Sequence, residues 1–162
     1  MNHSMKWRLV PLTESLGQEL CRWNYPQPYD IYNWPAWETM LRDDFEFANL
    51  SIRAQQYAAA LDEREQLCGY AQFFPIVGVT RLGLGLRPNL CGKGKGLGVY
   101  LTELLVQEAL RRAPQNEIDL EVLVWNDRAI RTYEKAGFAI TDTYERNTPT
   151  GIAEFHCMVY SG

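Results

Sequence analysis

The chain has 162 residues, of which 46% are hydrophobic and 22% charged, a composition typical of a globular protein with room for a full hydrophobic core. Its formal net charge of −4 argues against broad nucleic-acid binding, because phosphates attract basic surfaces. No apolar run approaches the length of a membrane span, and the N-terminal stretch MNHSMKWRLV holds no apolar signal core. We therefore expect neither a nucleic-acid partner nor a membrane.

The cysteines limit the classes further. Cys21, Cys68, Cys91 and Cys157 are scattered and form no C-x-x-C pair. This spacing argues against a zinc site and is typical of a protein in a reducing cytosol. We expect a cytoplasmic protein with no bound metal.

The N-terminal third is predicted to contain one strand and two helices. Residues 6–10 are expected to form a strand, and Thr13 can cap a helix that runs to about residue 23. Residues 24–35 are rich in proline, tyrosine and tryptophan and are expected to form a loop. Pro35 can then occupy the first position of a helix over residues 37–44.

The rest of the chain is predicted to alternate strands with two further helices. Strands are expected over 53–62, 67–76 and 80–86, the first two joined by the charged turn 63–66. A glycine-rich loop then leads into a helix to about residue 112, followed by a buried strand over 118–124 and a helix over 127–136 that Gly137 stops. Strands over 138–146 and 152–160 complete a mixed α/β fold, expected to be one domain over residues 1–162.

The most informative segment is the basic loop CGKGKGLG at residues 91–98. Its alternating glycines allow positive φ angles and a close approach of a ligand to the backbone, and the helix that follows aims its free N–H groups at the same point. The loop lacks the hydroxyl residue of a Walker A motif and the βαβ context of a dinucleotide fingerprint. We interpret it as a site for a phosphate-bearing cofactor, with an ordinary glycine-lysine surface turn as the alternative.

A second segment, LEVLVWNDRAIRTYEKAGF at residues 120–138, joins a strand directly to a helix. Asn126 can be a plain helix cap or a ligand for an amide. Tyr133 can be a packed amphipathic tyrosine or a functional hydroxyl. The residues alone leave both alternatives open.

Together, these two segments resemble the GCN5-related N-acetyltransferase (GNAT) superfamily, in the order and at the spacing of that family. The resemblance implies a mostly antiparallel central sheet in which two parallel strands, here 80–86 and 118–124, splay apart. It also implies acetyl-CoA as the cosubstrate.

The resemblance assigns the cofactor contacts residue by residue. The run Lys93-Gly94-Lys95-Gly96-Leu97-Gly98 matches the pyrophosphate loop Q/R-x-x-G-x-G/A, with lysine where arginine or glutamine is usual, whereas a frame that begins at Cys91 matches less well. Backbone N–H groups from Lys93 to Val99 would bind the pyrophosphate. The backbone of Leu84, Gly85 and Leu86 would pair with the pantetheine arm, and Asn126 matches the residue that contacts it.

The same resemblance suggests the catalytic groups. Tyr133 matches the tyrosine near the CoA sulfur and is the candidate general acid, while a backbone N–H near Leu86 would polarise the thioester carbonyl. Many members carry a glutamate on the strand that here reads TRLGLGL, which has none. Glu121 is the candidate base, as in ribosomal-protein N-terminal acetyltransferases, with a plain edge carboxylate as the alternative interpretation. Glu117 and Asp119 are weaker alternatives.

The acceptor is less well specified. The aromatic stretch from Trp23 to Trp37, with Asp30 and Glu38, can wall a pocket for a cationic amine or simply form a loop packed by its own rings. Cys91, beside lysines near a helix start, can have a lowered pKa or be an inert loop thiol. We expect a monomeric or homodimeric enzyme that acetylates a primary amine of a small molecule or protein. The alternative is a non-catalytic acyl-CoA-binding module.

Overall fold

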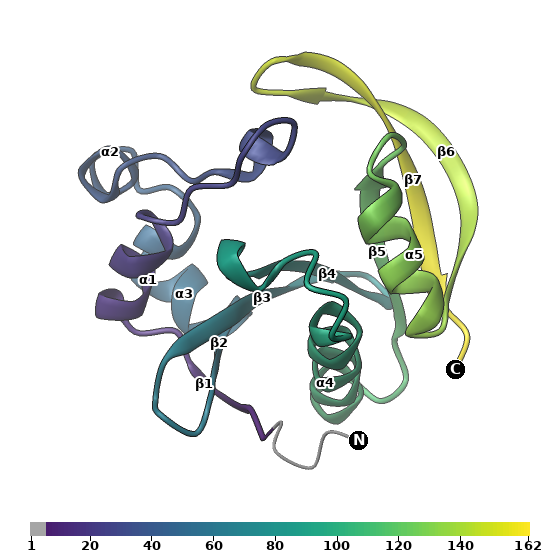
Figure 1. Ribbon diagram of the computed structural model, residues 1–162, viewed down its shortest axis with the longest axis horizontal. Coiled ribbons are helices and arrows are strands. Elements are labelled where there is room, and N and C mark those ends of the chain that lie inside the picture. The colour runs from purple at the N-terminus through teal and green to yellow at the C-terminus, as the bar shows by residue number, and fades with distance from the viewer. Residues whose placement is uncertain (1–5) are drawn as a thin grey trace. The chain divides into compact units, whose positions relative to one another are not determined.

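The computed structural model describes residues 6–162, which form a seven-stranded sheet and five α-helices (Figure 1). The strands are β1 (Arg8–Pro11), β2 (Tyr57–Leu61), β3 (Leu67–Ile76), β4 (Val79–Leu86), β5 (Glu117–Leu123), β6 (Phe138–Thr148) and β7 (Gly151–Tyr160). The helices are α1 (Glu14–Leu20), α2 (Trp37–Arg42), α3 (Leu50–Gln56), α4 (Leu97–Arg112) and α5 (Asp127–Lys135), with 3₁₀ turns η1 (Tyr29–Tyr32), η2 (Glu46–Ala48) and η3 (Pro88–Leu90).

The strand order in the sheet is β1-β2-β3-β4-β5-β7-β6. β4 and β5 run parallel, whereas β1–β2, β2–β3, β5–β7 and β7–β6 are antiparallel. The parallel register begins at Val79 opposite Glu117 and stops at Leu82 opposite Leu120, although both strands continue beyond that point. This confirms the predicted mixed α/β fold, with a mostly antiparallel sheet and a parallel pair that separates.

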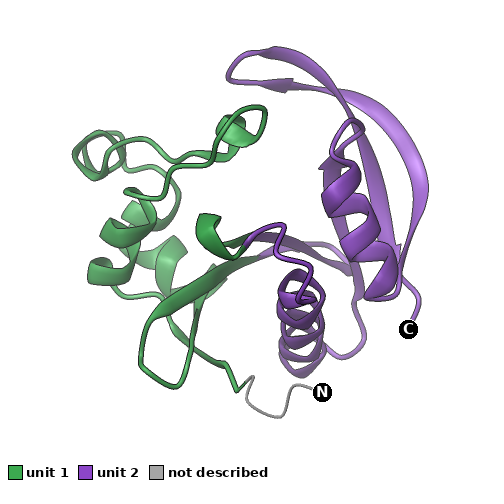
Figure 2. Ribbon diagram, in the orientation of Figure 1, with its two compact units in different colours: residues 1–72, 85–90 green, residues 73–84, 91–162 purple. Residues whose placement is uncertain are grey.

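The chain divides into two compact units, coloured separately in Figure 2. The first comprises residues up to 72 together with 85–90, and the second comprises 73–84 and 91–162. β3 and β4 each contribute residues to both units.

The core of the first unit forms around β2, whose five residues are all buried. Phe47 of η2 is fully buried and packs its ring edge against Tyr57 of β2, with ring centroids 5.4 Å apart. Gly17 of α1 lies so close to the same ring that a Cβ there would be 3.1 Å from Phe47 Cδ1. As predicted, Thr13 caps α1, because its hydroxyl accepts a hydrogen bond from the Leu16 N–H at 3.2 Å.

Several boundaries in this unit differ from the sequence-based expectation, among them that of β1, which is Arg8–Pro11 and not residues 6–10. The predicted strand over 53–62 is a helix, α3, up to Gln56 and a strand only from Tyr57. Asn49 caps that helix by accepting from Ile52 N–H at 2.9 Å, and the buried guanidinium of Arg53 donates to the Phe47 carbonyl at 2.9 Å. Both contacts stabilise the helical conformation. In addition, α1 ends at Leu20 rather than near residue 23. α2 starts at Trp37 as predicted but ends at Arg42 rather than near residue 44, and because Ala36 is its cap, Pro35 lies outside the helix.

The second unit has its core between the sheet and the helices α4 and α5. Leu101, Leu105 and Ala109 of α4 are almost fully buried and recur every four residues, so they lie on one face of the helix. α4 ends at Arg112 as expected, and Gly137 follows α5 with a positive φ of 107°. β6 and β7 extend as a long two-stranded ribbon (Figure 1). None of the helices in residues 6–162 has the length and apolar character that a membrane crossing requires.

Candidate active site

The glycine-rich loop before α4 has a regular alternation of backbone conformation. Gly92, Gly94 and Gly96 have φ angles of 67°, 66° and 69°, whereas the two intervening lysines keep negative φ. Alternation between left-handed and ordinary backbone turns successive N–H groups toward one side and forms a concave anion site. A Cβ placed on Gly94 or Gly96 would meet no atom within 4 Å, so these two glycines border open space.

The loop leads directly into the start of α4. Gly96 is the residue that caps this 16-residue helix and, having no side chain, it leaves the first-turn N–H groups available. These groups carry the positive end of the helix dipole. The loop and the helix start together can bind an anion such as a pyrophosphate.

Gly98 differs from the other loop glycines. It lies inside α4, and a Cβ there would be 3.1 Å from Thr132 Cγ2 of α5. Its small size therefore allows α4 and α5 to approach each other. The sequence pattern grouped Gly98 with the loop glycines and did not indicate this contact.

A further cation lies next to the loop and was not predicted from the sequence. A Cβ on Gly92 would be 3.3 Å from Nη1 of Arg128, which lies in the first turn of α5. In the sequence, only its place two residues after Asn126 could have drawn attention to Arg128.

Cys91 lies at the start of the same loop. Burial raises the pKa of its thiol more than the charge of Arg128 lowers it, so the net shift is upward. This direction favours the alternative of an inert loop thiol.

Asn126 and Tyr133 are both carried by α5. Asn126 is 6% exposed and caps the helix, because its Oδ1 accepts from the Ala129 N–H at 3.2 Å. The half-buried Tyr133 ring packs edge-on against Phe138 at 6.3 Å, and Phe138 in turn contacts Tyr160 at 5.4 Å. Thus the cap role of Asn126 is correct, and Tyr133 has a packing contact with Phe138.

Glu121 lies in the middle of a charged network on one face of the sheet. Its carboxylate accepts from the Tyr144 hydroxyl at 2.5 Å and pairs with two guanidiniums, those of Arg146 and Arg81. The Glu121 side chain is only 10% exposed. Burial, followed by this hydrogen bond, raises the pKa of Tyr144 well above its usual range.

The other two acidic candidates on β5 have different surroundings. Asp119 is 5% exposed and forms two hydrogen bonds of 2.9 Å with Arg81. Glu117 is exposed at the start of the strand. A depression of about 420 Å³ opens beside them, walled in part by Arg81, Asp142 and Tyr144.

The last three residues of β4 are Leu84, Gly85 and Leu86, beyond the end of its pairing with β5. The Arg87 N–H donates to the Cys68 carbonyl of β3 at 2.8 Å. Because hydrogen-bonding groups alternate sides along a strand, the N–H and C=O of Leu84 and Leu86 point away from β3. These groups are therefore directed to the edge that β5 leaves unpaired.

The aromatic N-terminal segment is mostly packed within the first unit. Trp23 and Tyr25 are 9% and 8% exposed. Trp34 packs edge-on against Phe47 with centroids 4.8 Å apart, and against Tyr70 with centroids 6.0 Å apart. These two ring contacts are therefore with η2 and β3 of the first unit and not with other rings of the segment.

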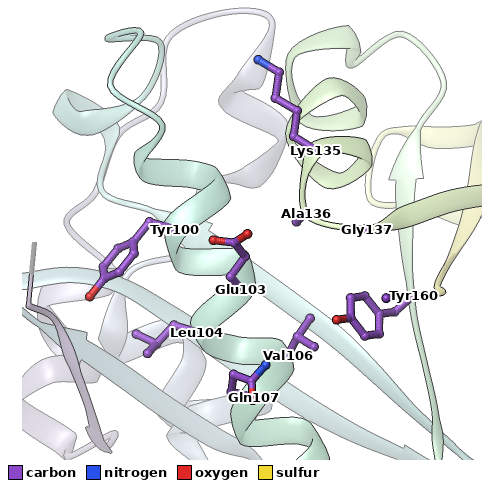
Figure 3. Close-up of a pocket in the computed structure, with 10 residues that line it drawn as sticks. Tyr100, Glu103, Leu104, Val106, Gln107, Lys135, Ala136, Gly137 and Tyr160 are labelled. Carbon is purple, nitrogen blue, oxygen red and sulfur yellow. The ribbon is translucent and has the colours of Figure 1, made fainter. Parts of the chain in front are cut away.

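A second depression, of about 500 Å³, lies in the second unit between α4 and the end of α5 (Figure 3). Its lining includes Tyr100 and Glu103 of α4 and Tyr160 of β7.

The described residues contain no evident metal site. Within residues 6–162, no three His, Cys, Asp or Glu side chains are grouped closely enough to hold a metal ion.

The chain matches a known protein family, and its structure is similar to solved structures. The family described as "Acetyltransferase (GNAT) family" matches residues 17–138. The structure is similar to that of AAC(6')-Ib in complex with ribostamycin and coenzyme A, with 27% identity, a TM-score of 0.64 and coverage of 95% of this chain and 92% of that chain.

Two more distant structures share the fold. A chimera of the spermidine N-acetyltransferase SpeG from Vibrio cholerae and hSSAT has 15% identity and a TM-score of 0.73, covering 97% and 95% of the two chains. The ribosomal-protein-S18-alanine N-acetyltransferase from Escherichia coli has 18% identity and a TM-score of 0.63, covering 96% and 93%. Because the family match extends over most of the chain, the protein belongs to the acetyltransferase (GNAT) family of N-acetyltransferases.

Proposed function

We propose that the protein transfers an acetyl group from acetyl-CoA to a primary amine of a small molecule or a protein. Its membership of the GNAT family supports this, as do the similar AAC(6')-Ib structures, which contain coenzyme A or acetyl-CoA. The names of the more distant neighbours describe acetylation of spermidine and of a ribosomal-protein alanine. From these names we take only the chemical class of the acceptor, an amine. We do not propose a particular one of these amines.

The observation that carries the proposal is the run of alternating φ angles that ends at the N-terminus of α4. We propose that backbone N–H groups of Lys93, Gly94, Lys95, Gly96, Leu97, Gly98 and Val99 bind the pyrophosphate of the cosubstrate. Since these donors belong to the backbone, a lysine in place of arginine or glutamine at position 93 changes little. Arg128, beside Gly92, adds positive charge at the same place.

The pantetheine arm is proposed to bind as an added strand along β4. The N–H and C=O of Leu84 and the N–H of Leu86 are directed away from β3, whereas the Leu86 C=O accepts a hydrogen bond from the Tyr25 hydroxyl. Gly85 between these two residues lets a ligand approach the backbone. Asn126, at the start of α5, is the proposed side-chain partner for a pantetheine amide. Its Oδ1 is used in the helix cap, so its Nδ2 is the group proposed to donate to the ligand.

In the proposed reaction the amine nitrogen attacks the thioester carbonyl, and the C–S bond breaks as the new C–N bond forms. The Leu86 N–H stabilises the developing oxyanion, Tyr133 donates its proton to the leaving thiolate, and Glu121 accepts a proton from the amine. The Glu121 carboxylate already interacts with Tyr144, Arg146 and Arg81, so an incoming amine has to compete with these donors. We therefore assign Glu121 a smaller share of the rate than Tyr133.

A second candidate function is an acyl-CoA-binding module without catalysis. It is favoured by the same contacts of Glu121, because they give the carboxylate a structural role. Turnover of acetyl-CoA against a panel of amines separates the two. Tight acetyl-CoA binding without turnover on any amine would support the binding module.

The loop itself can be tested with a matched pair of glycine variants. Gly96 and Gly78 have φ angles of 69° and 76°, and a Cβ added to either would meet no atom within 4 Å. Replacing either with alanine should cost a similar ~1–2 kcal/mol of stability, because both hold left-handed backbone. Only Gly96→Ala should also weaken acetyl-CoA binding in calorimetry. Equal affinity in the two folded variants would remove the loop from the cosubstrate site.

A further inference from the structure

The last residue of β4 is held by a tyrosine that lies 61 residues earlier in the chain. The Tyr25 hydroxyl donates a hydrogen bond of 2.7 Å to the Leu86 carbonyl. Tyr25 is 8% exposed, so this bond is shielded from water. Both residues belong to the first unit.

The same peptide group is held at its other end. The Leu86 C=O and the Arg87 N–H belong to one planar peptide, and the Arg87 N–H donates to the Cys68 carbonyl at 2.8 Å. The Arg87 side chain adds a hydrogen bond of 3.1 Å from Nη1 to the Leu67 carbonyl. With a bond at each end, the Leu86–Arg87 peptide plane cannot rotate freely.

Gly85 explains why such a restraint is needed. A Cβ at this position would collide with the Tyr70 ring and would lie 3.1 Å from the Tyr25 hydroxyl oxygen. The two tyrosines therefore require glycine here, and glycine is the residue with the greatest backbone freedom. The hydrogen bond from Tyr25 holds the carbonyl of Leu86, the residue that follows this flexible position.

Tyr25 is itself well positioned. Its backbone N–H donates to Asn33 Oδ1 at 2.7 Å, and Asn33 Nδ2 donates to Asn24 Oδ1 at 3.1 Å. The loop around Tyr25 is thus closed by side-chain hydrogen bonds. The Tyr25 phenol therefore reaches Leu86 from a loop that is itself held by hydrogen bonds.

We propose, on the basis of the acetyl-transfer function proposed above, that Tyr25 is a positioning residue for the reaction. The N–H of Leu86 belongs to the neighbouring Gly85–Leu86 peptide and lies on the same edge of the strand as the Leu86 C=O. The two peptides are joined through the φ and ψ angles of Leu86, so a bond that holds the C=O narrows the range of directions open to the N–H. That N–H is the proposed donor to the acetyl carbonyl. A donor stabilises an oxyanion most when its direction is set before the reaction begins.

The test compares Tyr25→Phe with Tyr57→Phe. The Tyr57 hydroxyl is also in the first unit, belongs to a residue only 2% exposed and donates to Glu46 Oε1 at 2.9 Å. Tyr25→Phe should lower kcat about 10-fold and change the KM for acetyl-CoA less than about 2-fold, since one oriented hydrogen bond is lost. Tyr57→Phe removes a bond of similar burial and should leave kcat within about 2-fold of wild type.

A second measurement does not depend on turnover. In ¹⁵N-labelled wild-type protein, the Leu86 amide proton should move downfield more with acetyl-CoA than with CoA, because only acetyl-CoA offers the carbonyl. This difference should shrink in Tyr25→Phe and persist in Tyr57→Phe. If the two variants match each other in kcat and in the Leu86 shift, the role of Tyr25 is overturned while the acetyltransferase proposal stands. Wild-type protein that binds no acetyl-CoA would overturn both.

Discussion

Arg81 and Asp119 lie directly opposite each other in the parallel pair β4–β5, and their side chains form two hydrogen bonds of 2.9 Å. The Asp119 side chain is 7% exposed and that of Arg81 30%. This ion pair spans the two strands one residue before their pairing ends at Leu82 and Leu120. It therefore ties the strands together close to the point where they separate.

Loss of the arginine should be costly because it leaves a buried carboxylate without its main partner. We expect Arg81→Leu to lower the free energy of unfolding by about 2–3 kcal/mol, below the usual range for a fully buried pair because Arg81 is partly exposed. Urea unfolding at pH 7 measures this. Arg8→Leu is the matched control, since the Arg8–Glu65 pair has the same chemistry at 55% and 59% exposure. Equal losses in both variants would contradict the role given to burial.

The Tyr133 hydroxyl is predicted to act in catalysis, whereas that of Tyr160 is not. Both rings pack against Phe138 in the second unit, with centroids 6.3 Å and 5.4 Å away, so their phenylalanine variants keep comparable packing. Tyr133→Phe should lower kcat roughly 10²-fold with little change in CoA binding, as expected for a general acid. Tyr160→Phe should retain wild-type kcat. Steady-state kinetics with the best amine, together with CoA calorimetry, decides between these outcomes.

Glu121 is predicted to contribute less than Tyr133 to the rate. Glu121→Gln keeps the shape of the side chain and removes its charge, and should reduce kcat/KM by about 10-fold. Glu117→Gln removes a carboxylate from the exposed start of the same strand and serves as the control. A pH–rate profile of Glu121→Gln that coincides with that of wild type would leave Glu121 with a structural role only.

Local signals in the sequence were enough to predict several elements with their correct ends. β3 was predicted over residues 67–76 and α4 up to residue 112, because turn residues and a glycine loop border them sharply. α3 was missed, since its two stabilising contacts, the Asn49 cap and the bond from Arg53 to Phe47, are not visible in a periodicity of apolar residues. The apolar run that follows, YAAAL, was predicted correctly as a strand.

The parts of the site that were not predicted depend on contacts between distant residues. Glu121 was chosen from its position on one strand, but Tyr144 and Arg146 reach it from β6, across the intervening strand β7. On β7 the residue paired with Glu121 is Cys157, whose side chain is small. The position of Tyr144 also depends on a register shift in β6 between Ile140 and Asp142. A sequence without a structure does not reveal such a shift.

The stability of α4 is predicted to depend on pH through Glu108. Hydrogen bonds from Arg111 first, and then Arg112, lower the pKa of this carboxyl below its ordinary value of 4.5. A lowered pKa in the folded state means that the stabilisation is fully present above pH ~4.5 and is lost as the pH falls through the folded value. Wild type should therefore lose more stability than Glu108→Gln between pH 6 and pH 3, measured by thermal unfolding. Glu103→Gln, which removes a charge from the same helix, controls for net charge.

The contact between Gly98 and Thr132 gives a prediction that separates packing from cofactor binding. Gly98→Ala would place a methyl group 3.1 Å from Thr132 Cγ2, so we expect a loss of about 1–2 kcal/mol from overpacking between α4 and α5. Thr132→Ser removes the Cγ2 methyl group. The double variant Gly98→Ala/Thr132→Ser should therefore regain most of the stability that Gly98→Ala alone loses, as expected for two residues in contact. Gly94→Ala should show no such rescue by Thr132→Ser, because its Cβ would face open space. Urea unfolding of wild type, the two single variants and the double variant measures the coupling energy between positions 98 and 132. If the losses of unfolding free energy at Gly98 and Thr132 are additive, the predicted contact between them is contradicted.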